Sequence, residues 1–186
     1  MARIKVDLDN TGKLSVTKID AAVRQLEAAI RLWFEDGDPV VICTLTYSGY
    51  EIIHAINKGA PMVPDMFVYA KDEKHETELK VIFRLDSNFL KHAAKDPNEV
   101  HHLATRVYPL VLLDAINTYV RLGFPARPLF TAFMLWMGLN YPQFLAEPLS
   151  ESFRQLRSIQ QAGAFSKKDL LDAALKLVTQ QTAAGV

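Results

Sequence analysis

Apolar residues recur every three or four positions through most of the chain, the spacing that places side chains on one face of an α-helix. The clearest run begins after Thr17 and shares one apolar face: Ile19, Ala22, Val23, Leu26, Ala29, Ile30 and Trp33. Thr17, with Asp20 three residues later, is typical of a helix N-terminus. Asp38 and Pro39 are a cap and a first-turn proline, so they predict the start of a second helix over 39–57.

The same periodicity continues toward the C-terminus. It predicts further helices over 72–94, 109–122, 129–139, about 150–161 and 166–180. Residues 3–16 alternate instead, which is typical of a short hairpin or an extended arm that turns at Gly12. We therefore expect an all-α fold: a compact, up-and-down-like bundle of five to seven helices in a single domain of residues 1–186, with an N-terminal extended arm or hairpin over 1–16.

Composition narrows the class of protein. The 186 residues are 49% hydrophobic and carry 21 basic and 21 acidic side chains, so no overall charge draws the chain to nucleic acid or to anionic lipid. The longest apolar run, 129–139, is well short of the about 20 residues that span a membrane, and the N-terminus does not resemble a signal peptide. We expect a cytoplasmic protein with no membrane association. The single cysteine, Cys43, excludes an intramolecular disulfide, and we expect a buried, inert thiol.

The third predicted helix carries the most suggestive polar face. Arg84, Asn88, Lys91, His92 and Lys95 fall on the arc opposite its apolar residues. Because Asn88 and His92 are four residues apart, they share one side of the helix, where His92 would be a neutral base beside two lysines. The three cations would bind a phosphate. The alternative is a solvated basic face on a structural helix.

Asp86 lies within the apolar arc of this same helix. A buried carboxylate costs stability unless it meets a partner, and Arg106 and Arg121 are candidate partners. The second interpretation is a carboxylate that orients His54 or another base.

The back of the second helix combines Cys43, Tyr47, Tyr50 and His54. Aromatic rings with polar tips and a histidine would suit a small-molecule pocket between helices. The alternative is ordinary core, in which those polar tips bind neighbouring groups.

Several potential metal ligands also cluster in the sequence: His92, Asp96, Glu99, His101 and His102. Because Asp96-Pro97 interrupts the helix, their spacing does not place them on one face. We expect His101 and His102 to be exposed loop residues. We predict no metal site and no cofactor.

The segment Ser87-Asn88-Phe-Leu-Lys-His92 resembles the Arg-to-His segment that marks the HEPN superfamily of helical domains. That superfamily includes dimeric, metal-independent ribonucleases and many noncatalytic relatives. Serine stands here at the four-residue spacing where the family has arginine, and Arg84 is displaced outside the family spacing. The resemblance implies a helical homodimer. It favours a noncatalytic one, because serine cannot stabilise the charge that develops on a phosphate.

Three functional hypotheses follow. The first is a noncatalytic, HEPN-like, homodimeric binding or interaction protein with an RNA or protein partner, whose contact surfaces are 129–139 and the back of the second helix. The second is a metal-independent ribonuclease in which His92 is the base, Asn88 orients it and Arg84 or Lys91 holds the phosphate. The third is a small-molecule sensor whose pocket contains Tyr47, Tyr50 and His54.

Overall fold

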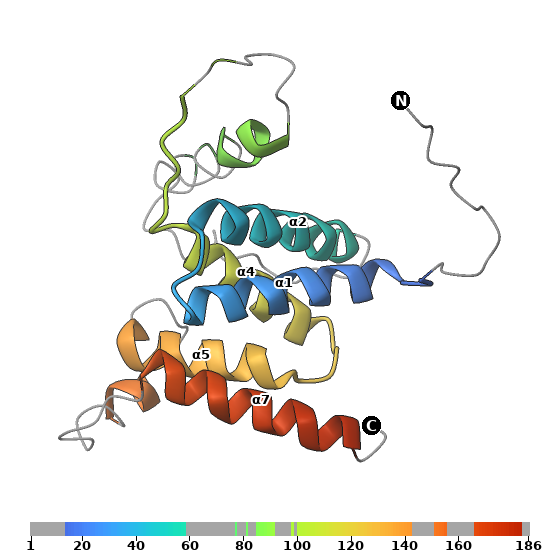
Figure 1. The fold of residues 1–186 in the computed structure, drawn as a ribbon, viewed down its shortest axis with the longest axis vertical. Helices are drawn as coiled ribbons and strands as arrows, with labels where there is room; N and C mark the ends of the chain where they lie inside the picture. The colour runs from blue at the N-terminus through green and yellow to red at the C-terminus, as the bar shows by residue number, and fades with distance from the viewer. Residues whose placement is uncertain are drawn as a thin grey trace, which may run out of the picture.

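A computed structural model describes residues 14–58, 77, 81, 85–91, 98, 100–142, 151–155 and 166–183. Five helices are described over their whole length: α1 (Lys18–Phe34), α2 (Pro39–Asn57), α4 (Tyr108–Arg121), α5 (Pro128–Asn140) and α7 (Lys167–Ala183). Two shorter helical segments cover 85–91 and 151–155, and no strand occurs in these ranges. The prediction of an all-α bundle is confirmed (Figure 1). Most of the predicted N-terminal arm, residues 1–13, lies outside the described part of the chain.

The helix starts follow the sequence signals. The Thr17 hydroxyl accepts a hydrogen bond from the Asp20 N–H at 3.1 Å, and the Asp20 carboxylate accepts one from the Thr17 N–H at 3.0 Å. This reciprocal pair satisfies two backbone donors that the first turn of α1 leaves free. The Asp38 carboxylate caps α2 by accepting from the Val40 N–H at 2.7 Å. Both predicted N-termini are confirmed.

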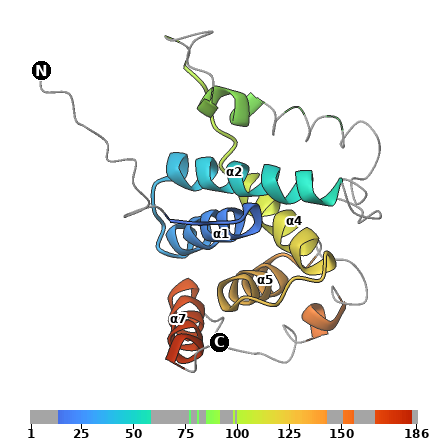
Figure 2. The same cartoon turned by 90° about the vertical axis from the view of Figure 1, so that its right-hand side faces the viewer.

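A glycine sets the distance between α1 and α2, which form the most extensive helix pair. A Cβ atom added at Gly49 would lie 2.7 Å from Leu26 Cγ, so only glycine fits this approach without a shift of the packed leucine. α4 packs against α2. Figures 1 and 2 both show α5 and α7 together on the side of α1 away from α2.

The core lies between these layers. Its largest fully buried side chains come from α1, α2, α4 and α5: Leu26, Ile30, Ile42, Ile53, Val111, Leu112, Leu113, Ile116, Leu129, Phe130, Phe133 and Met137. α4 is buried over a wide arc because α2 and α5 both pack against it. Along α4, Leu113 and Ile116 are buried, whereas Val120 is 45% exposed.

The apolar segment 129–139 is also part of this core. Leu129, Phe130, Phe133 and Met137 are each at most 2% exposed. These four side chains therefore belong to the core of the bundle, and a partner could contact this segment only through its other residues. Within the described residues, no helix combines the length and the apolar character that crossing a bilayer requires.

Candidate functional site

The polar face predicted on the third helix falls only partly within the described chain. Three of its residues lie outside it: Arg84, His92 and Lys95. Asn88 is exposed. Lys91 forms an ion pair with Glu51 of α2, and the Ser87 hydroxyl donates to the same carboxylate at 2.9 Å. The one described cation of the predicted phosphate-binding set therefore already has an acidic partner.

Asp86 is buried, as its position in the apolar arc predicts, at 2% exposure. Its carboxylate accepts hydrogen bonds from the Tyr47 hydroxyl at 3.2 Å and from the Ala104 N–H at 3.3 Å. Its other oxygen lies 2.6 Å from His101 Nε2, which donates when the carboxylate is ionised. The partners of Asp86 are therefore these groups, and not Arg106 or Arg121 as the sequence suggested. These contacts join the segment 85–91 and the loop before α4 to α2.

His101 is therefore not the exposed loop residue that the sequence predicted. Its side chain is only 16% exposed, and its ring stacks on Phe89 with 4.9 Å between centroids. His102 is exposed, as expected. The difference arises because His101 is the histidine whose side chain meets the buried carboxylate of Asp86.

The back of α2 makes a second contact of the same kind. His54 Nε2 lies 2.9 Å from Asp114 Oδ2 of α4, and Asp114 is 2% exposed. The Tyr50 ring lies 4.0 Å from the His54 ring, between centroids. Tyr47 and His54 thus each direct a polar group at a buried carboxylate. Neither of the two pockets described below has Tyr47, Tyr50 or His54 among its lining residues.

Cys43 is fully buried, which confirms the prediction for this residue. Burial, and then the negative charge of Asp86, raise the pKa of its thiol to about 12. Burial likewise raises the pKa of Tyr47, with a further contribution from Asp86. Both groups therefore stay protonated at neutral pH, and Cys43 is not a thiolate nucleophile.

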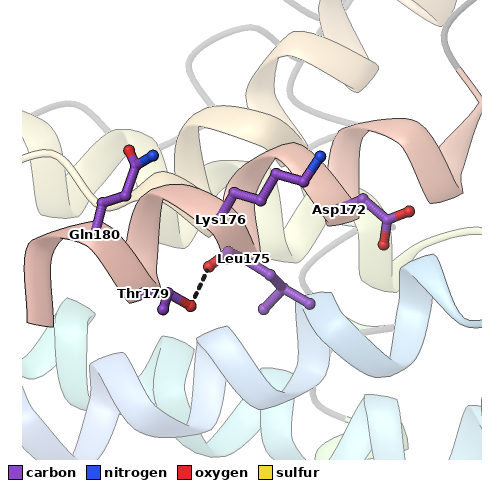
Figure 3. Close-up of a pocket in the computed structure, with 5 residues that line it drawn as sticks. All are labelled: Asp172, Leu175, Lys176, Thr179 and Gln180. Carbon is purple, nitrogen blue, oxygen red and sulfur yellow. Dashed lines mark hydrogen bonds between the residues drawn. The ribbon is translucent and has the colours of Figure 1, made fainter. Parts of the chain in front are cut away.

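One of the two pockets is a shallow hollow on the surface of α7. The residues that line it recur every three or four positions on that helix: Asp172, Leu175, Lys176, Thr179 and Gln180. Figure 3 shows the Thr179 hydroxyl donating back to the Leu175 carbonyl, at 2.9 Å, while Lys176 and Gln180 extend away from Leu175. Asp172 and Lys176 are four residues apart, so their charges offset one another. This hollow is a solvated helix face.

The second pocket, here called the Trp33 pocket, has a volume of about 600 Å³. It forms where the end of α1, the start of α4, the end of α5 and the start of α7 meet. The ends of α1 and α5 and the start of α7 lie on the left in Figure 1. Its described lining residues are Trp33, Arg106, Pro109, Leu110, Trp136, Met137, Tyr141 and Lys167.

Aromatic rings form one continuous wall of the Trp33 pocket. The rings of Trp33 and Trp136 meet edge to face with 4.5 Å between centroids, and Tyr141 lies 5.5 Å beyond Trp136. Exposure rises along this series, from 6% at Trp33 to 43% at Tyr141. The rings therefore run from the core to the surface, and they present apolar faces with polar groups near the rim.

Two cations also line the Trp33 pocket, and their surroundings differ. Lys167 Nζ lies 2.6 Å from Asp36 Oδ1, donates to the Trp33 carbonyl at 3.0 Å, and sits 4.0 Å from the centroid of the Trp33 ring. Its charge is thereby offset and its position fixed. Arg106 is exposed, and its guanidinium has no hydrogen-bond or ion-pair partner among the described residues.

The sequence did not predict the Trp33 pocket, because four segments far apart in the chain supply its walls. One signal was present. In the predicted helix 129–139, Phe130, Phe133 and Met137 share a face, and Trp136 lies off it. In the structure Trp136 is half-buried and forms the middle of the aromatic wall.

Comparison of the chain with models of protein families, with curated proteins and with solved structures gave no match. Among the described residues, no three His, Cys, Asp or Glu side chains are grouped so that they could hold a metal ion. Of the predicted cluster around 92–102, His92, Asp96 and Glu99 lie outside those residues.

Proposed function

We propose that this protein is a noncatalytic binding protein and that the Trp33 pocket is its site for a small molecule. One observation carries the proposal: the pocket combines a volume of about 600 Å³ with an aromatic wall and a small number of polar groups at the rim. Small-molecule sites have volumes of roughly 300–1,000 Å³ and this same division between apolar walls and a few polar groups.

The chemistry of the lining supports binding over catalysis. The described lining residues include no carboxylate, histidine, serine or cysteine, the groups that most often supply acid–base or nucleophilic catalysis. The histidine–carboxylate contacts lie elsewhere, at Asp86 and Asp114. Lys167 Nζ already donates to the Asp36 carboxylate and to the Trp33 carbonyl.

The test is calorimetric titration of the full chain with naphthylacetamide, a neutral bicyclic probe, together with its effect on urea unfolding. Binding to the folded state alone raises the free energy of unfolding by mass action, by about 2.7 kcal/mol at a hundredfold excess over Kd. Leu110→Trp fills the pocket from its wall and is expected to abolish binding. Leu177→Trp makes the same change on the exposed face of α7 and is the matched control.

The outcomes separate clearly. Binding that Leu110→Trp removes and Leu177→Trp keeps supports the proposal. Absence of binding up to millimolar probe contradicts it, and so does binding that survives Leu110→Trp in a folded protein.

A homodimer remains part of the proposal, and a feature of the third helix supports it. Leu85 and Phe89, four residues apart in the helical segment 85–91, are 54% and 36% exposed, so they form a short apolar stripe on one helix face. Exposed stripes of this kind are used in contacts between chains. Sedimentation equilibrium is expected to show a dimer that Leu85→Glu dissociates and Leu177→Glu leaves intact. A monomeric wild-type protein would contradict it.

A further inference from the structure

We infer that the ligand of the Trp33 pocket is an aromatic monoanion, a planar ring system that carries one carboxylate. The inference rests on the proposed function and adds the charge and shape of the ligand. The carboxylate pairs with Arg106 at the rim, and the rings lie against the aromatic wall formed by Trp33, Trp136 and Tyr141.

The charge of the pocket favours a single negative charge. Arg106 and Lys167 each contribute one positive charge, and Asp36, 2.6 Å from Lys167, offsets one of them. Among the described lining residues, one net positive charge is left, on Arg106. Its guanidinium is planar and offers paired N–H donors, a geometry that matches the two oxygens of a carboxylate.

The backbone around Arg106 is fixed before any ligand arrives. The Ala104 N–H donates to the buried Asp86 carboxylate at 3.3 Å, and the Val107 N–H donates to the Ala104 carbonyl at 2.8 Å. Arg106 therefore projects from a turn that is bonded to the interior on the side of α2. A binding group on an ordered backbone loses less entropy on association than one on a free loop.

The shape of the wall favours a flat ring system. Trp33 and Trp136 meet edge to face, with 79° between their planes, so they form a corner. A planar ligand in such a corner lies against the face of one ring and the edge of the other, the two arrangements that aromatic pairs prefer. Pro109, Leu110 and Met137 supply the remaining apolar lining that the structure describes.

The experiment compares two probes that differ only in charge, naphthylacetate and naphthylacetamide, by calorimetric titration of the full chain. The wild-type protein is expected to bind the carboxylate about tenfold more tightly than the amide, since a charge-assisted hydrogen bond contributes more than a neutral one. In Arg106→Gln the ratio is expected to fall to about one, while amide affinity stays within about twofold. Arg24→Gln, on the exposed face of α1, is the matched control and is expected to keep the ratio.

Each outcome has one meaning. Equal affinity of the wild-type protein for both probes overturns the inference and leaves the proposed function standing. A carboxylate preference that persists in Arg106→Gln also overturns it, because another group then binds the anion. If neither probe binds, the proposed function itself is contradicted.

Discussion

Two regions of this protein differ in whether their charged side chains have hydrogen-bond partners. Around α2, the buried carboxylates of Asp86 and Asp114 each meet a histidine, and Asp86 accepts from Tyr47 as well. In the Trp33 pocket, Arg106 stands at the rim of an aromatic wall and meets no partner among the described residues. The polar side chains around α2 therefore bond to one another. The Trp33 pocket has space for a ligand but few reactive side chains among its described lining residues.

The difference has an energetic reason. Removing one member of a buried, hydrogen-bonded charged pair leaves its partners without compensation and costs roughly 3–5 kcal/mol. Removing an exposed cation costs little. Stability should therefore be sensitive to substitution around α2, and ligand binding to substitution in the pocket.

The largest effect is expected from Asp86→Ala. The substitution leaves the Tyr47 hydroxyl, the His101 Nε2–H and the Ala104 N–H without their acceptor, in an interior where Asp86 is 2% exposed. We expect a loss of about 3 kcal/mol in the free energy of unfolding, measured by urea denaturation followed by circular dichroism.

The matched control for this substitution is Asp172→Ala, which removes an exposed carboxylate from α7. We expect a change of no more than about 0.5 kcal/mol there. Equal effects of the two substitutions would show that the Asp86 contacts contribute nothing net to stability, and the comparison between the two regions would fail.

Alkaline pH should also weaken the region around α2. The thiol of Cys43 has a pKa raised from 9.0 to about 12 by burial, so the folded protein keeps a proton that the unfolded chain loses above pH 9. Because the unfolded state then binds fewer protons, the free energy of unfolding falls as pH rises, by about 1.4 kcal/mol per pH unit once the unfolded thiol is ionised.

The measurement is a series of urea unfolding curves of the wild-type protein and Cys43→Ala between pH 7 and pH 10. Unfolded tyrosines, whose ordinary pKa is 10.0, add the same contribution to both slopes, so the difference between the slopes reports on Cys43. Cys43→Ala is expected to lower stability at pH 7 and to remove this part of the slope, so that the difference between the two proteins narrows as pH rises above 9. Identical slopes in the two proteins would contradict the assignment to Cys43.

A smaller effect is expected from Lys167→Met at the edge of the pocket. It removes the bonds to Asp36 and the Trp33 carbonyl and the contact with the Trp33 ring, but it keeps an apolar stem. Since Asp36 is largely exposed, we expect a loss of only about 1 kcal/mol in the free energy of unfolding. Lys168→Met, one residue along α7 and exposed, is the control. If Lys167→Met lowers the free energy of unfolding no more than this control does, the contacts of Lys167 do not stabilise the packing of α7 against α1.

The sequence predicted what depends on residues near one another in the chain. Thr17 and Asp20 are three residues apart, so the start of α1 could be predicted from that spacing alone. The burial of Asp86 followed from its place in the apolar arc. The periodicity of the apolar residues was enough to predict an all-α bundle.

What the sequence could not predict depends on contacts across the fold. His101 reaches Asp86 from a loop that has no periodicity, so nothing local marks it as a partner. The Trp33 pocket requires the ends of α1, α4, α5 and α7 to meet, which is a property of their packing. Trp136, off the core face of its helix, is the single local sign of it.

The smallest effect on stability is expected from Arg106→Gln. Its guanidinium makes no hydrogen bond or ion pair within the described structure, and its backbone is held by neighbours that the substitution leaves in place. We expect the free energy of unfolding to change by no more than about 0.5 kcal/mol in urea denaturation without ligand. A loss above about 1 kcal/mol in the free energy of unfolding would mean that Arg106 has a structural partner and is not available to bind an anion. A near-zero change in the free energy of unfolding, beside the large loss in Asp86→Ala, would show that the two regions have different roles. Asp86 would then stabilise the fold that positions Arg106, and Arg106 would be available to bind a ligand.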